Sequence, residues 1–314
     1  VKQRTITGLT KPNAPQGVQL PNLGPWQTPA KDFYRIDTAI SPPVVSPSAW
    51  TLRIHGMVDR EITLTFDELI RRPLVEAWVT LNCVSNPVGG EFIGNAWWSG
   101  YALADLLREA GISPDADALL QKSHDGWTCG TPISVVMDGR PALLAVAMNG
   151  EPLPIEHGFP VRTIVPGLYG FVSATKWVVD IEVTRFEKFT AFWTSRGWAA
   201  QAPVKIASRI DLPRANAVVT SGKVAVGGAA WHQHTGIKGV EVPGDGGAWL
   251  PMRLGPTPST DAWVQWSGEV EVAPGKHAVR VRAIGADGEV QTGAETDVAP
   301  DGPTGWHSVS FEAR

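Results

Sequence analysis

The sequence predicts an α+β protein in which a mixed domain of strands and a few short helices is followed by an all-β domain. Three observations predict this class. The 314 residues include 33 glycines and 26 prolines, which favour short strands and turns over long helices. Only two short segments have the spacing of an amphipathic helix, whereas runs of alternating apolar and polar residues recur from Trp50 onward. After a proline-containing stretch at residues 203–213, such runs continue without any helical pattern.

Composition divides the chain into three parts. Residues 1–30 are rich in proline, glycine and glutamine and predict an arm that lies across the surface or is partly disordered. Residues 31–205 are expected to form the mixed domain. Residues 206–314 are expected to form an all-β domain of the size of an immunoglobulin-like sandwich, with short runs separated by turns such as the one at residues 245–247.

Local signals place the helices and strands of these parts. Thr65 and Glu68 have capping-box spacing before a short helix that Pro73 stops. A second helix is predicted over residues 101–110, with Gly111 suited to end it. Strands of the mixed domain are predicted at residues 50–56, 76–83, 118–122, 142–148, 161–165 and 176–184. Strands of the second domain are predicted at residues 217–226, 239–242, 249–254, 263–272, 277–283 and 306–311.

Charge and cysteine content exclude several classes of protein. The net charge of −4 disfavours a nucleic-acid-binding protein, because phosphate contacts need clustered lysine and arginine. Two cysteines are too few for a zinc or iron–sulfur site built from cysteine alone. The longest apolar runs fall far short of the roughly 20 residues that span a bilayer. Because the chain begins at Val1, we expect a processed form or a fragment.

Cys83 ends an apolar strand and opens a polar, glycine-rich loop over residues 83–90. A reactive side chain in this place is held by the strand while the loop admits a ligand. Taken alone, however, a cysteine beside a strand is more often a small buried hydrophobe, and a disulfide with Cys129 is a further alternative.

Two other segments carry polar groups that suit an anionic or heterocyclic ligand. His157 and Arg162 flank a glycine and a proline, and an arginine fork near a histidine suits a phosphate or a fused heterocycle. A salt bridge within the loop is the plainer alternative. Ser173, Thr175 and Lys176 follow in a turn whose hydroxyls, backbone N–H groups and cation could bind an anion.

Together these segments resemble the sulfite oxidase family of molybdenum–molybdopterin oxidoreductases. The resemblance covers about residues 30–314, and its second part resembles that family's immunoglobulin-like dimerisation domain. Bacterial members often carry N-terminal membrane helices, which implies a membrane-anchored region outside this chain and an extracytoplasmic location. The matching motifs are FYR at 33–35, LNC at 81–83 with Asn86, WSG at 98–100, LADLL at 103–107, HGFPVR at 157–162, VPG at 165–167 and KW at 176–177.

The resemblance implies a site for a molybdenum–molybdopterin cofactor. Cys83 is implied to be the single protein thiolate on molybdenum, with the dithiolene of the pterin supplying the other sulfurs. The cofactor would carry the oxygen-atom transfer, while the protein binds and orients it. The residues implied to contact the cofactor are Phe33, Tyr34, Arg35, Ser123, Asp125, His157, Arg162, Ser173, Ala174, Thr175 and Lys176.

The chain departs from the family pattern where substrate would bind. Sulfite-oxidising members place arginines where this chain has Val88 and Val264, and a tyrosine where it has Trp198. Losing two arginines removes the charge-assisted hydrogen bonds that would hold a dianion. We therefore expect a less charged small-molecule substrate than sulfite, such as an S- or N-oxide, with Trp198 at its pocket. Three residues elsewhere could restore positive charge: Arg196, Lys205 and His124.

Three functions compete at this point. The first is a molybdenum oxidoreductase, expected to act as a homodimer and to exchange electrons with an external cytochrome- or quinone-linked partner, because the chain carries no haem or flavin motif. The second is a non-catalytic binding or scaffold protein that keeps the fold. The third is a hydrolase that uses Cys83 and His157; it is the weakest, because no orienting third group is indicated.

One further motif, WHQH at residues 231–234, resembles a metal-binding pair. Two histidines that lie two positions apart on a strand share one face, but no third ligand is indicated for them. The motif therefore predicts a surface strand.

Overall fold

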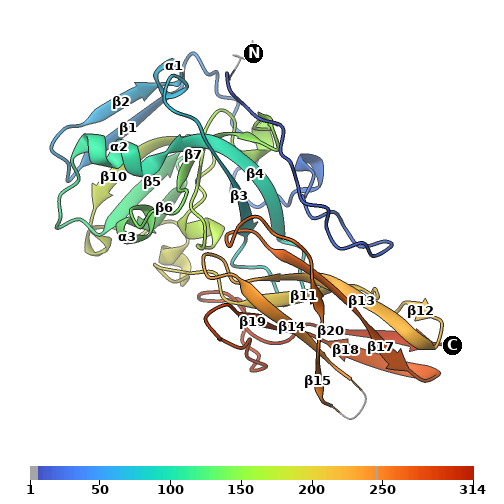
Figure 1. Cartoon of the computed structure of the whole chain (residues 1–314). Coiled ribbons are helices and arrows are strands. Elements are labelled where there is room, and N and C mark those ends of the chain that lie inside the picture. Colours follow the sequence, from blue (N-terminus) through green and yellow to red (C-terminus); the bar gives the residue numbers. More distant parts are fainter. Residues whose placement is uncertain (1–5, 245–246) are drawn as a thin grey trace.

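The computed structural model describes residues 6–244 and 247–314, and their regular structure is mostly β. Figure 1 shows two β-rich bodies, one containing the strands up to β10 (Val178–Thr184) and the other containing those from β11 (Ala207–Leu212) onward. No helix of the described residues has the length and apolar character needed to cross a membrane. The α-helices are α1 (Phe66–Leu69), α2 (Leu103–Ala110) and α3 (Ile133–Val136).

One sheet of the first body has the strand order β2-β1-β10-β5-β6, in which β1 and β10 run parallel and the other neighbours run antiparallel. Burial alternates along β1, as its sequence predicts, because Leu52 and Ile54 point into the core. Strands β2 and β6 were not predicted. The bounds are β1 (Thr51–Gly56), β2 (Ile62–Thr65), β5 (Ala118–Ser123) and β6 (Thr128–Pro132).

The second sheet of this body has the order β3-β4-β7-β8, and β9 pairs with β7. Strand β4 was not predicted because it is buried along almost its whole length and lacks the alternation of a half-buried strand. Strand β3 leads directly into Cys83, and β9 begins at Arg162. The bounds are β3 (Val75–Asn82), β4 (Ile93–Ala102), β7 (Leu143–Met148), β8 (Glu151–Pro152) and β9 (Arg162–Ile164).

The helix signals of the sequence are confirmed, apart from one boundary. The Thr65 hydroxyl accepts the N–H of Glu68 (3.3 Å) and the Glu68 carboxylate accepts the N–H of Thr65 (2.8 Å), which is the predicted capping box. Gly111 ends α2 in the left-handed region, with φ of 70°. The helix begins at Leu103 and not at Tyr101, because residues 101 and 102 continue the β4 ladder to β7.

The second body consists of three sheets, with the orders β11-β13-β17-β16, β12-β20-β18 and β15-β14-β19. Each predicted run contains strand residues, whereas β11 was missed because it lies in the stretch interpreted as a boundary. The immunoglobulin-like assignment and the boundary at residue 206 stay predictions, and the predicted turn at residues 245 and 246 lies outside the described residues. The remaining bounds are β12 (Val218–Val219), β13 (Gly222–Trp231), β14 (Ile237–Pro243), β15 (Trp249–Pro251), β16 (Arg253–Leu254), β17 (Val264–Val272), β18 (Gly275–Arg280), β19 (Arg282–Gly285) and β20 (Ser308–Ala313).

The N-terminal arm, in its described residues 6–29, has no helix or strand, and it runs along both bodies (Figure 1). Trp26 is 3% exposed, and its indole N–H donates to the carbonyl of Trp263 (3.1 Å). In return, the indole N–H of Trp263 donates to the carbonyl of Trp26 (2.8 Å), which also accepts a bond from the side chain of Asn95 (3.2 Å). The arm is therefore anchored in the core between the bodies, and the expectation that it merely crosses the surface is only partly correct.

Candidate functional site

The first body contains a cavity of about 1020 Å³, counting its open mouth. Its wall brings together Cys83 after β3, Ser123 at the end of β5 and Arg162 at the start of β9. These residues come from different strands, so the sheets fix their relative positions. Because the cavity is open at its mouth, a ligand can enter it from solvent.

Cys83 is held by a loop, residues 83–92, that folds back on itself. The N–H of Cys83 donates to the carbonyl of Phe92 (2.9 Å), and the carbonyl of Cys83 accepts the N–H of Asn86 (3.1 Å). The side-chain oxygen of Asn86 accepts the N–H of Phe92 (2.9 Å). Gly90 packs so closely against Asn86 that a side chain there would collide with it. This network fixes the backbone of Cys83, whose side chain lines the cavity.

Both cysteines are free, so the alternative of a disulfide between Cys83 and Cys129 is wrong. Cys129 lies inside β6 and is fully buried, and burial raises the pKa of its thiol to about 12. Cys83 is half-buried and lines the cavity. Only Cys83 is placed to bind a metal or to react.

Arg162 lines the cavity although it is only 4% exposed. Its guanidinium donates to the carbonyls of His157 (3.1 Å) and Ala174 (3.4 Å) and lies 5.2 Å from the ring centroid of Trp98. Among the described residues no carboxylate pairs with it, and its Nε is buried without a hydrogen-bond partner. Burial lowers the pKa of Arg162 to about 10. A buried cation without a counter-charge is unfavourable unless a ligand supplies the anion.

His157 lies in the turn before Arg162, in a position that depends on Gly158. Gly158 has a φ of 107°, and a side chain there would press on Arg162 and Lys176. Burial, and secondly the charge of Arg162, lower the pKa of His157 to about 4. The ring is therefore neutral near pH 7, and its Nε2–H donates to the carbonyl of Ala30 (3.1 Å).

Lys176 supplies a second cation to the wall, and Asp37 holds it in the structure. The Lys176 ammonium lies 2.6 Å from the Asp37 carboxylate, which also pairs with Arg35 at 2.8 Å. Burial lowers the pKa of Lys176 to about 8. Burial alone would raise the pKa of Asp37, but hydrogen bonds from Arg35 and Lys176 lower it. The Asp37 carboxylate thus pairs with the Lys176 ammonium that an anionic ligand would contact.

Two aromatic residues that come directly after the N-terminal arm in the sequence, Phe33 and Tyr34, line the cavity. The rings of Phe33 and Tyr34 are stacked with centroids 5.3 Å apart, and Phe33 meets the rings of Trp98 and His157 edge-on at 5.8 and 5.7 Å. Burial, and secondly the nearby Cys83, raise the pKa of Tyr34 well above its ordinary value. The phenol therefore stays protonated and can donate a hydrogen bond.

Most residues predicted to contact cofactor or substrate line this cavity: Phe33, Tyr34, Cys83, Ser123, Asp125, His157, Arg162, Ala174, Lys176 and Trp198. Three do not: Arg35, Ser173 and Thr175. The Ser173 hydroxyl donates to the carbonyl of Tyr169 (3.0 Å), and the N–H of Thr175 donates to the hydroxyl of Thr163 (2.8 Å). These bonds shape the loop around the cavity, and direct contact of these three residues with a cofactor stays a prediction.

One side of the cavity is aromatic. Trp198 lies 5.9 Å from the ring of Phe171 and 6.5 Å from that of Trp193, and all three line the wall. Arg196, Lys205, His124, Val88 and Val264 do not line it. The suggestion that Arg196, Lys205 or His124 restores positive charge at the pocket is therefore wrong for this structure. Of the described lysines and arginines, only Arg162 and Lys176 reach the wall.

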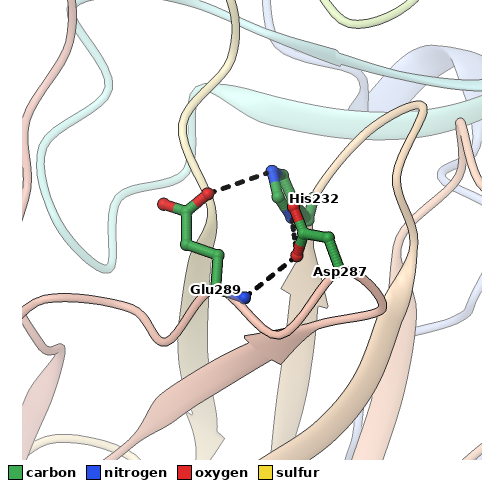
Figure 2. Close-up of side chains that lie close together, drawn as sticks. All are labelled: His232, Asp287 and Glu289. Atoms are coloured by element: carbon green, nitrogen blue, oxygen red, sulfur yellow. Dashed lines mark hydrogen bonds and ion pairs between the residues drawn. The ribbon is translucent and has the colours of Figure 1, made fainter.

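The WHQH motif takes part in a separate cluster on the second body (Figure 2). Trp231 ends β13 and His232 lies beyond it, so the prediction of a surface strand for the whole motif is wrong. Figure 2 shows His232 between Asp287, 4.0 Å from Nδ1, and Glu289, 3.6 Å from Nε2. The carboxylates, which the sequence did not indicate, approach different ring nitrogens that point apart. One ligand atom from each of these three residues lies within 4.8 Å of the others, which is close enough for a metal ion, but both carboxylates are exposed and exposed acidic groups of this kind are common without one.

Comparison with known proteins connects the cavity to a family. Residues 39–193 match the family model of the oxidoreductase molybdopterin binding domain. The chain is 32% identical over 183 residues to the uncharacterized oxidoreductase YuiH of Bacillus subtilis, which covers 58% of this chain and 89% of that protein. It is 31% identical over 255 residues to the mitochondrial sulfite oxidase of Mus musculus, which covers 68% of this chain and 46% of that enzyme.

The chain is a molybdopterin-binding oxidoreductase of the sulfite oxidase family. A solved structure shares the fold of this oxidoreductase: the sulfane dehydrogenase SoxCD from Paracoccus pantotrophus matches with a TM-score of 0.75 and 23% identity, over 86% of this chain and 75% of that chain. At this identity the likeness shows the fold alone. The chain spans less than half the length of the mouse sulfite oxidase.

The family implies a molybdenum–molybdopterin cofactor, and the cavity of this oxidoreductase fits such a group. Cys83 offers the one accessible thiol, and thiolate is a ligand that suits a soft metal centre. Arg162 and Lys176 offer positive charge for a phosphate, and the buried Nε of Arg162 and hydroxyl of Ser123 lack partners that a polar heterocycle could supply. The individual contacts stay predictions.

Sequence reasoning missed several residues of this wall. Asp37 reaches Lys176 across 139 positions, so no local signal could have found it. Phe171 and Trp193 look like ordinary core aromatics in the sequence. Ser85 could have been found, because it lies two residues after Cys83 in a loop that was already singled out.

Proposed function

We propose that this oxidoreductase catalyses a two-electron oxygen-atom transfer with a molybdenum–molybdopterin cofactor, on a small substrate that carries less negative charge than sulfite, such as an S- or N-oxide. One observation carries the proposal. Arg162 and Lys176 are the only described lysine or arginine side chains that share a wall with Cys83. In the proposal both serve the cofactor, which leaves no such cation for a dianionic substrate.

Three residues would hold the cofactor at the wall. Cys83 would bind the metal through its sulfur, and Arg162 and Lys176 would pair with the phosphate. When bound, the cofactor supplies the oxygen-atom exchange and the two-electron redox chemistry. His157 would present Nδ1 as an acceptor, because its Nε2–H is committed to the carbonyl of Ala30.

The aromatic side of the cavity would bind the substrate. Phe171, Trp193 and Trp198 offer apolar surface that excludes water and packs against the uncharged part of an S- or N-oxide. Tyr34 lines the same cavity and keeps its proton, so it can donate a hydrogen bond to a substrate oxygen but does not serve as a base.

The proposal includes an external electron donor or acceptor, cytochrome- or quinone-linked. It is supported by the sequence, which contains no Cys-x-x-Cys-His motif for haem attachment. A homodimer joined through the second body and an extracytoplasmic location belong to the same proposal, and they rest on the family resemblance of the sequence.

Metal analysis tests the proposal most directly. Protein made in a host that synthesises the cofactor should contain molybdenum, together with a fluorescent pterin that is released on denaturation. Folded protein that contains neither would instead support the non-catalytic scaffold. A screen that follows a redox dye would then identify the substrate, and sulfite turnover with kcat/KM above roughly 10⁴ M⁻¹s⁻¹ would contradict the substrate assignment.

A further inference from the structure

The Cys83 sulfur has a hydrogen-bonding neighbour on the cavity wall. The Ser85 hydroxyl lies 3.0 Å from Sγ of Cys83, and both side chains are half-buried wall residues. Among the described residues, Ser85 is the only side chain with a hydrogen bond to this sulfur. The contact is short enough for an O–H···S hydrogen bond and points to a role at the sulfur.

The loop that carries Ser85 is held by contacts from two sides. Within the loop, Asn86 bonds to the carbonyl of Cys83 (3.1 Å). From the second body, Arg209 donates to the carbonyl of Gly90 (3.1 Å), and Gly89 packs directly against the ring of His307. These contacts hold the backbone from which the Cys83 and Ser85 side chains extend.

The chemistry of the two groups decides the direction of the bond. A hydroxyl can donate or accept, but a thiolate can only accept. When the Cys83 sulfur is ionised and binds a metal, Ser85 must therefore be the donor. A hydrogen bond to a ligand sulfur withdraws electron density from it and weakens its donation to the metal.

We propose that Ser85 is a positioning residue that orients the Cys83 sulfur and reduces its electron donation, which raises the reduction potential of the bound centre. This inference rests on the proposed function, because it requires Cys83 to be the metal ligand. Ser85 acts on the centre through Cys83 and holds it in the geometry that the loop presents.

The test compares Ser85→Ala with Ser85→Thr in cofactor-loaded protein. Ser85→Ala removes the donor and should lower the midpoint potential, by about a tenfold change in the equilibrium constant of two-electron reduction, or roughly 30 mV. It should also shift the sulfur-to-metal charge-transfer absorption to lower energy, because the sulfur becomes more electron-rich. Ser85→Thr keeps the hydroxyl and should retain most of the wild-type potential.

Thr38→Val is the matched control, because Thr38 lines the same cavity and its hydroxyl does not bond to the sulfur. It should leave potential and absorption unchanged. Thermal unfolding and the molybdenum content of each variant separate a change at the sulfur from a folding or loading defect. If Ser85→Ala does not load, Ser85→Gly also removes the hydroxyl and should show the same fall in potential, and an unchanged potential in that variant would overturn the role of Ser85.

The outcomes distinguish this inference from the function on which it rests. Wild-type protein without molybdenum would end both. Loaded wild-type protein with an unchanged potential and spectrum in Ser85→Ala would overturn the role of Ser85 and leave the proposed function standing. An equal shift in Thr38→Val would also overturn it, because the effect would then belong to the cavity as a whole.

Discussion

The two cysteines stand in the same local pattern but in opposite surroundings. Cys83 is followed two residues later by Ser85, and Cys129 is followed two residues later by Thr131. Ser85 lies 3.0 Å from its sulfur, whereas Thr131 lies 3.7 Å from Cys129 and donates its hydrogen to the carbonyl of Val172 (2.7 Å). The first pair lies beyond the end of a strand and faces the cavity, while the second is buried within β6. Position relative to the strand end, and not the pattern itself, makes one thiol available.

Replacing each cysteine by serine should give the largest difference in activity between the two regions. Mutating a residue that only hydrogen-bonds to a metal ligand costs about 10–100-fold in activity or metal affinity. Because Cys83→Ser replaces the ligand itself, its turnover should fall by more than about 100-fold. Cys129→Ser should stay within about twofold of wild-type activity and lose about 1 kcal/mol in the free energy of unfolding. Dye-linked turnover and urea unfolding of both variants measure this, and equal losses of activity would erase the distinction.

Alkylation of the native apoprotein should show the same contrast without any assay of activity. At pH 8 iodoacetamide should label Cys83, whereas Cys129 should react more than about 100-fold more slowly, because it is buried and its pKa is about 12. Mass spectrometry of peptides taken over time measures both rates. Denatured protein, in which both thiols should react alike, is the control. Comparable labelling in the native state would mean that β6 opens readily.

The region around the cavity should also make the free energy of unfolding sensitive to acid. The folded-state pKa of His157 is about 4, below its ordinary value of 6.5, so between these values the unfolded chain binds more protons. The free energy of unfolding of the apoprotein should therefore fall as pH drops from about 6.5 to 4, by up to about 3 kcal/mol. Unfolding by urea at several pH values measures this. His157→Gln should flatten the dependence, and an unchanged slope in that variant would assign it to other groups.

Replacing Arg162 should change the free energy of unfolding least, but it should clearly lower the amount of cofactor that the protein binds. Because its charge is buried without a carboxylate, Arg162→Met should keep the unfolding free energy of the apoprotein within about 1 kcal/mol of wild type, or raise it. The molybdenum content should fall, since the cation for the phosphate is gone. Urea unfolding and metal analysis give the two values. A loss above about 3 kcal/mol would show that the guanidinium supports the fold itself.

Local signals in the sequence predicted what depends on local geometry. The capping box at Thr65 and the helix end at Gly111 were correct, because each is decided within a few residues. Strand β4 escaped because burial on both faces removes the alternation that marks a strand. The family was correct, and the α+β class was correct only in part, because the regular structure is mostly β with three short α-helices. The bond between Trp26 and Trp263 could not be predicted from the sequence, because it joins residues 237 positions apart.

The same distinction between local and long-range features applies to the candidate site. Cys83, His157 and Arg162 were predicted because motif and residue type identify them. Asp37 was missed because its partner Lys176 is distant in the sequence and is reached only through the fold. Thr175 was included by motif, yet its backbone N–H bonds to the hydroxyl of Thr163 and it stays off the cavity wall. A motif indicates that a segment belongs to the site, whereas only coordinates show which of its atoms face the ligand.

The anchored arm constrains the order in which the protein can be assembled. Trp26 can form its bond only after Trp263, 237 positions later in the chain, has been made, and Ala30 only after His157, 127 positions later, has been made. The arm therefore cannot complete its docking before both of these partner residues are present. Phe33 and Tyr34 follow directly on the arm and form part of the cavity wall. That part of the wall is therefore incomplete until the arm has docked.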